Sequence, residues 1–184
     1  MNDKERLSGN VIARLTKGDW IEKNGEKVWV PGVSLEFRCD NIVTDSGDQF
    51  YAEHNTTHAL AVDFHGATCG IRLGCGTTGG GNKADTDVKT VCTGSSGYFV
   101  RIQTGYPITN DSEANNTGAT TDCVTWYYYF SATCGQVTKV NEGAIVNSAT
   151  SPTKALAHWD FGTTFDKTTS DTLQVFVNHT FAGV

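Results

Sequence analysis

Residues 123–131 decide the fold class most clearly, and they read CVTWYYYFS. Successive side chains of a β-strand point to opposite faces of its sheet. One face then carries Val124, Trp126, Tyr128 and Phe130, and the other carries Cys123, Thr125, Tyr127 and Tyr129. Because both faces carry aromatic rings, this strand is expected to lie between two packed surfaces, such as a core and a subunit interface.

The same period of two recurs on both sides of this stretch. Residues 33–39 alternate Val33, Leu35, Phe37 and Cys39 with polar side chains, which indicates a strand with that apolar face buried. Residues 172–179 alternate likewise, with Leu173, Val175 and Val177 expected to point inward. Asn24-Gly25 is the strongest short hairpin signal, and it separates two apolar segments. Residues 45–48 read as a turn. The pattern predicts about eight to ten short strands and no helix longer than one or two turns, which is typical of an antiparallel all-β sandwich or barrel.

The charge balance excludes some classes of partner. Charged residues make up 18% of the 184 residues, and the net charge is −6. The 14 Lys and Arg residues are scattered, whereas nucleic-acid-binding domains gather theirs into a basic patch. No signal peptide is visible, and no apolar run approaches the length that spans a bilayer. We therefore expect no nucleic acid and no membrane insertion. Residues 1–9 are expected to form a flexible attachment segment, and residues 10–184 a single domain.

The six cysteines leave two possibilities open. They could form three disulfides in 15 possible connectivities. In a protein made in the cytosol, reduced and buried thiols are the expected state. No C-x-x-C pair exists, so a zinc site is not expected.

Motifs that would carry chemistry are weak. Residues 74–79 match G-x-G-x-x-G, but Gly-Gly-Asn-Lys follows them instead of a helix-forming segment, so a flexible loop is the expectation. His54 and His58 lie too far apart along a strand to share a metal. Loop acids could bind calcium through their oxygens, but they are expected to be solvated, namely Asp45, Asp48, Asp85 and Asp87. No catalytic residue, cofactor or metal is predicted.

Residues 165–179, which read FDKTTSDTLQVFVNH, carry a resemblance. The stretch resembles the closing strands of small jelly-roll proteins found in the virions of tailed bacteriophages, and the resemblance covers about the last 30 residues. It implies a jelly-roll sandwich similar to the tumour-necrosis-factor fold, commonly trimeric. Such proteins serve as head decoration, head fibres or tail tips, and some bind host glycans. The six cysteines and the hairpin at residues 20–30 depart from that pattern.

The sequence thus predicts a non-enzymatic virion protein, made in the host cytoplasm, that forms a homotrimer. Its expected partners are a major capsid or tail protein and host surface glycans. Aromatic residues are expected to form the oligomer interface or a glycan contact, namely Trp126, Tyr127, Tyr129 and Phe176. The alternatives are a carbohydrate-binding module or lectin, and a small β-sandwich glycan hydrolase, which would need two carboxyl groups at a suitable separation.

Overall fold

The computed structural model describes residues 8–54, 56, 63–76, 80–92, 96–109, 111 and 122–181. Within them lie one α-helix, α1 (Asp45–His54), one 3-10 turn, η1 (Ser96–Tyr98), and nine strands. The strands are β1 Ser8–Lys23, β2 Glu26–Val43, β3 Gly70–Gly74, β4 Phe99–Val100, β5 Ile108–Thr109, β6 Cys123–Phe130, β7 Val137–Val146, β8 Ala155–Lys167 and β9 Thr172–Thr180.

All nine strands belong to one sheet with the order β4-β3-β7-β8-β2-β1-β9-β6-β5. Every neighbouring pair is antiparallel. The prediction of an antiparallel all-β fold is therefore confirmed.

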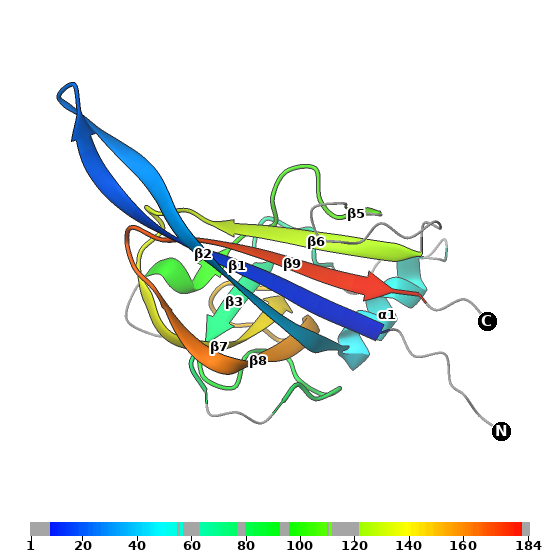
Figure 1. Cartoon of the computed structure of the whole chain (residues 1–184). Helices are drawn as coiled ribbons and strands as arrows, with labels where there is room; N and C mark the ends of the chain where they lie inside the picture. The colour runs from blue at the N-terminus through cyan, green and yellow to red at the C-terminus, as the bar shows by residue number, and fades with distance from the viewer. Residues whose placement is uncertain are drawn as a thin grey trace.

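The segment 99–109 brings the two edges of this sheet together. Its first part, β4, pairs with β3, and its last part, β5, pairs with β6. Between them, Ile102 forms a bridge with Tyr128, and the Gln103 amide donates to the Tyr127 carbonyl at 2.9 Å. The sheet consequently curls around one core, as Figure 1 shows.

The inner face of the curled sheet holds the residues that alternation predicts. Leu173, Val175 and Val177 of β9 are fully buried, as the sequence predicts. They pack in one cluster with the inner faces of β1 and β6, which contribute Val11, Ala13, Leu15, Trp126, Tyr128 and Phe130. Apolar burial of this extent is the main free-energy term that holds such a fold together.

Helix α1 contradicts the predicted turn at residues 45–48 and the expected absence of longer helices. The Thr44 hydroxyl accepts the Gly47 amide at 3.2 Å, which is an N-terminal cap. A Cβ at Gly47 would lie 2.1 Å from the Leu156 carbonyl oxygen, so the helix lies directly against β8. The helix is fixed by this packing and by the burial of Phe50, whereas its sequence has little apolar periodicity.

A disulfide joins Cys75 and Cys92, which corrects the expectation that all the cysteines are reduced. Gly74 and Val91 form a bridge, and this brings the next residues side by side with their Cα atoms 5.1 Å apart. That separation lies within the range that a disulfide spans. A bond that closes a loop of this length stabilises a fold by about 3 kcal/mol in the chain-entropy view. The other four cysteines are not bridged.

The predicted hairpin at Asn24-Gly25 is confirmed. Both residues have positive φ, 55° and 81°, which suits the tight turn that joins β1 to β2. The two strands pair from Gly9 with Asn41 to Lys23 with Glu26. They run beyond the body of the molecule as a narrow projection, which we call the arm (residues 17–35; Figure 1).

Candidate functional site: an apolar arm and an aromatic pocket

The arm carries the core face of the sheet out into solvent. On β2, Phe37 points into the core and stacks on Phe165 with ring centroids 4.5 Å apart. Leu35 follows on the same face, because it lies two residues away along the strand and pairs with the buried Leu15. Val33 comes next, where the register between β1 and β2 shifts. Leu35 is 44% exposed and Val33 is 69% exposed. The inward prediction is therefore wrong for these two residues, since the chain covers its own apolar face only as far as Phe37.

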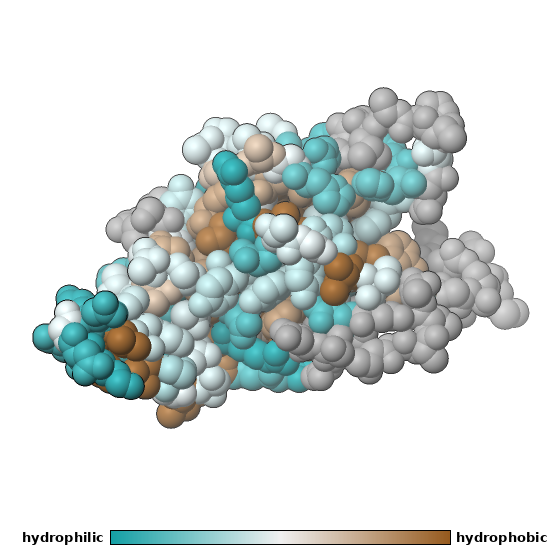
Figure 2. All heavy atoms as spheres, turned by 90° about the horizontal axis from the view of Figure 1, so that it is seen from above, coloured by the Kyte–Doolittle hydropathy of each residue, from teal (hydrophilic) through white to brown (hydrophobic). Residues whose placement is uncertain are grey.

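The far part of the arm is apolar on both faces. Exposed large side chains lie there on each strand, namely Trp20, Ile21, Val28 and Val30. Figure 2 shows hydrophobic residues among hydrophilic ones at this end of the molecule. A two-stranded hairpin on its own is only marginally stable in water. Apolar side chains that cluster on a surface typically mark a contact site, so the far part of the arm is a candidate contact surface.

Both outer edges of the arm also lack a neighbouring strand among the described residues. β9 pairs with β1 only from Ser8 to Thr16, and β8 pairs with β2 only over residues 41–43. Unpaired backbone groups along such edges can accept another strand.

Specific contacts fix the arm at its base. The Trp29 indole donates to the Ser170 carbonyl at 2.7 Å, and its ring lies over Gly18, where a Cβ would come within 2.4 Å of it. Lys17 reaches the Asp171 carboxylate at 2.8 Å. These contacts tie the arm to the β8–β9 turn, so the body sets the direction in which the arm projects.

The four aromatic residues singled out from the sequence do not share one surface. Trp126 lies on the inner face of β6 and is 1% exposed. On the outer face, Tyr127 stacks on Phe176 with centroids 4.6 Å apart, and Tyr106 packs against Tyr127 at 5.1 Å. Phe176 is fully buried beneath these neighbours, whereas Tyr129 is exposed. The outer face of β6 and β9 is thus covered in part by this chain's own segment 99–109.

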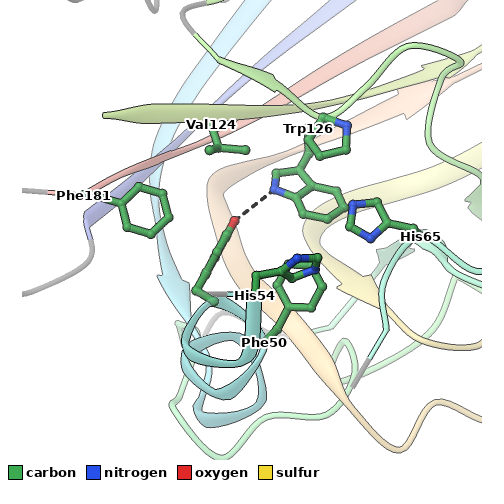
Figure 3. Close-up of a pocket in the computed structure, with 8 residues that line it drawn as sticks. Phe50, His54, His65, Val124, Trp126 and Phe181 are labelled. Carbon is green, nitrogen blue, oxygen red and sulfur yellow. Dashed lines mark hydrogen bonds between the residues drawn. The ribbon is translucent and has the colours of Figure 1, made fainter. Parts of the chain in front are cut away.

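An aromatic pocket lies at the opposite end of the molecule from the arm. It has a volume of about 360 Å³, and its lining combines α1, the start of β6 and the residue that follows β9 (Figure 3). The lining residues are Phe50, Tyr51, His54, His65, Pro107, Val124, Trp126 and Phe181. Most of these side chains are rings, so the pocket suits an apolar or aromatic group.

Tyr51 links the pocket wall to a buried histidine. The Trp126 indole donates to the Tyr51 hydroxyl at 3.0 Å, and the hydroxyl lies 2.5 Å from Nδ1 of His179 (Figure 3 shows the first of these bonds). Burial lowers the pKa of His179 to about 3. The ring is therefore neutral, so Nδ1 accepts the Tyr51 proton and Nε2 carries the hydrogen.

This histidine makes the fold sensitive to acid. The folded-state pKa lies below the unfolded value of 6.5, so the contribution of His179 is complete above pH 6.5 and decreases as the pH falls towards 3. Between pH 6.5 and pH 4, we expect His179 to reduce the free energy of unfolding by about 3 kcal/mol. Urea unfolding at a series of pH values should show this loss, and His179→Gln should remove it. His65→Gln, at an exposed histidine, is the control and should leave the loss in place. An equal loss in wild type and His179→Gln would contradict the assignment.

A second histidine holds a buried ionic clasp, which we define as Asp85, His158 and Glu142. The His158 ring donates from Nδ1 to Asp85 at 2.6 Å and from Nε2 to Glu142 at 2.8 Å. Burial alone would lower the pKa of His158, but these two hydrogen bonds outweigh it and raise the pKa. Both ring nitrogens are occupied and the ring is 1% exposed, so His158 is held as a structural cation.

The clasp includes one of the turn acids, and it binds the glycine-rich motif at residues 74–79 through the amide of Gly76. Glu142 accepts the backbone amides of Gly76, Lys89 and Thr90. The Gly76 amide therefore donates its hydrogen bond to a carboxylate of the same chain, whereas a phosphate-binding loop would donate it to the ligand. Asp85 belongs to the clasp, and Asp87 pairs with buried Arg72 at 3.0 Å. The expectation that these two acids are solvated is wrong.

The expectation that His54 and His58 do not share a metal involves position 58, which lies outside the described residues. Within the described part of the chain, no helix is both long and apolar enough to cross a membrane.

Comparisons of the chain with protein-family models, with curated proteins and with solved structures found no match.

Proposed function

We propose that this protein is a non-enzymatic structural subunit of a bacteriophage particle, and that it self-associates through its arm. The observation that carries the proposal is the apolar side of β2, which passes from the half-buried Phe37, packed against the core, to the exposed Leu35 and then the exposed Val33. The apolar side chains at the outer end of this face are exposed to water. A second molecule that packs on them would bury them as the core buries the inner end.

The construction of the arm supports a role in assembly. Its base is fixed by Trp29 and Lys17, so little conformational entropy is lost when it docks. Its far part carries apolar side chains on both faces and Trp20 near the turn. Tryptophan is among the residues that contribute most to protein interfaces.

The finer parts of the proposal come from the resemblance of residues 165–179 to virion jelly-roll proteins. They are a jelly-roll architecture, a trimer, and a position on the particle as head decoration or as a tail or fibre component. A capsid or tail protein would be the attachment partner. Adhesion to host glycans would use the exposed Tyr129 rather than Tyr127, because Tyr127 is packed between Phe176 and Tyr106.

Analysis of purified particles tests the virion assignment. When particles from a phage lysate that expresses the gene are purified by density gradient and digested, we expect peptides of this chain in stoichiometric amounts. A tagged copy that lacks residues 18–31 should be depleted from the particles, while a tagged full-length copy is retained. Full-length protein that stays in the particle-free fraction would contradict the proposal.

A further inference from the structure

We infer that the aromatic pocket receives the tip of the arm, Trp20 foremost, from another copy of the chain. This inference rests on the proposed function, because it names the surface on which the self-associating arm docks.

The arm cannot reach the pocket of its own molecule. Gly9 of β1 and Val124 of β6 both pair with His179, which places the start of β1 beside the pocket. From there β1 leads away from the pocket to the arm (Figure 1). At about 3.3 Å per residue, Trp20 lies about 35 Å along the strand from Gly9. Any pocket that the tip fills must therefore belong to another molecule.

The two surfaces match in chemistry. The pocket of about 360 Å³ is open and lined mainly by rings, and it holds no Lys, Arg, Asp or Glu. Trp20 is the largest of the exposed apolar side chains near the turn of the arm, at 42% exposure, and Ile21 and Val28 lie next to it towards the turn. An indole ring can stack against the rings of the pocket, and its N–H needs a hydrogen-bond acceptor when it is buried.

The polar groups around the two surfaces are also compatible. His54 and His65 line the pocket, and each imidazole offers nitrogen atoms that can donate or accept a hydrogen bond. Glu22 lies two residues after Trp20 and so points to the same face of β1. A docked arm would then bring an indole N–H and a carboxylate to a pocket whose polar lining groups include imidazoles.

An arm docked in the pocket of another copy makes a head-to-tail contact. A contact between two different patches of identical chains is heterologous, and it closes into a ring when the rotation between neighbours allows it. A cyclic trimer needs contacts of this kind, and it would use each arm and each pocket once.

Photo-cross-linking locates the docked tip directly. A benzophenone amino acid replaces Trp20, and chains labelled with light and heavy isotopes are mixed and allowed to exchange subunits before irradiation. We expect cross-links between a light arm and a heavy peptide that contains α1, the start of β6 or Phe181. The same probe at Val33, nearer the base of the arm, should not cross-link to these peptides.

A variant of the pocket gives a second readout that does not use the probe. Val124→Phe adds bulk inside the pocket and should weaken self-association at least tenfold. Tyr129→Trp adds bulk on the other face of β6 and should leave the association unchanged. Circular dichroism verifies that both variants are folded.

The outcomes separate this inference from the proposed function. Oligomers whose position 20 cross-links elsewhere, or whose association is unaffected by Val124→Phe, would overturn the pocket as the docking site and leave self-association intact. Cross-links confined to one isotope label would also overturn it. Chains that never associate would overturn the proposed function together with this inference.

Discussion

Glu142→Leu is expected to lower the free energy of unfolding by about 3–5 kcal/mol, which is the usual cost of removing one partner from a buried ion pair. The carboxylate is buried and accepts from His158 at 2.8 Å, from the Lys89 amide at 3.0 Å and from the Thr90 amide at 3.1 Å. The Gly76 amide donates to the same carboxylate at 3.3 Å. Leucine cannot accept any of these bonds, so a buried cation and three amides would lose their acceptor.

Urea unfolding of the purified variants at pH 6 measures this loss. Glu142→Gln keeps a hydrogen-bond acceptor while removing the charge, and it should lose less stability than Glu142→Leu. Glu36→Gln is the surface control, because Glu36 pairs with Arg14 and Arg38 at exposed positions, where ion pairs contribute at most about 1 kcal/mol. A loss below about 1 kcal/mol for Glu142→Leu would show that the clasp does not hold residues 85–90 to the sheet.

Trp20→Ser should weaken self-association by about 30-fold or more, because truncation of a central interface tryptophan typically costs at least about 2 kcal/mol. The fold of each chain should be unaffected, because Trp20 is exposed and far from the core. Sedimentation equilibrium gives the association constant, and near-ultraviolet circular dichroism reports the packing of the core.

The matched control for this substitution is Lys27→Ser. Lys27 pairs with Glu22 on the same face of the arm as Trp20, but it presents a charged group instead of a ring. We expect its association constant to change by less than threefold, as is usual for a charge at the rim of an interface. Equal association constants for wild type and Trp20→Ser would mean that the apolar tip is not part of the contact.

Local patterns predicted the parts of this fold that depend on neighbouring residues. The alternation in residues 123–130 and 172–180 determines which side chains of β6 and β9 point inward. Asn24-Gly25 sets the turn of the arm, because few other residues adopt positive φ at both positions.

The sequence pattern did not reveal where the body of the molecule ends. Val33, Leu35 and Phe37 follow one alternating pattern, yet only Phe37 has the rest of the chain packed against it. Alternation reports which face a side chain takes, but burial depends on which distant segments cover that face. The alternation in residues 33–39 therefore predicts a half-buried strand where the structure has the base of an exposed arm.

Contacts between distant residues account for the other differences. His158 meets Asp85 and Glu142 from positions 73 and 16 residues away, and no local motif marks such a cluster. Cys75 and Cys92 come together only because Gly74 and Val91 form a bridge. The aromatic pocket likewise combines α1, β6 and the residue after β9.

The mass of the unmodified chain in solution tests most directly whether a second copy covers the arm. Native mass spectrometry across a range of concentrations should give a discrete oligomer, with three chain masses as the dominant species. Amide hydrogens of residues 18–34 should exchange slowly in that species. A single chain mass at every concentration, with rapid exchange throughout the arm, would contradict the account.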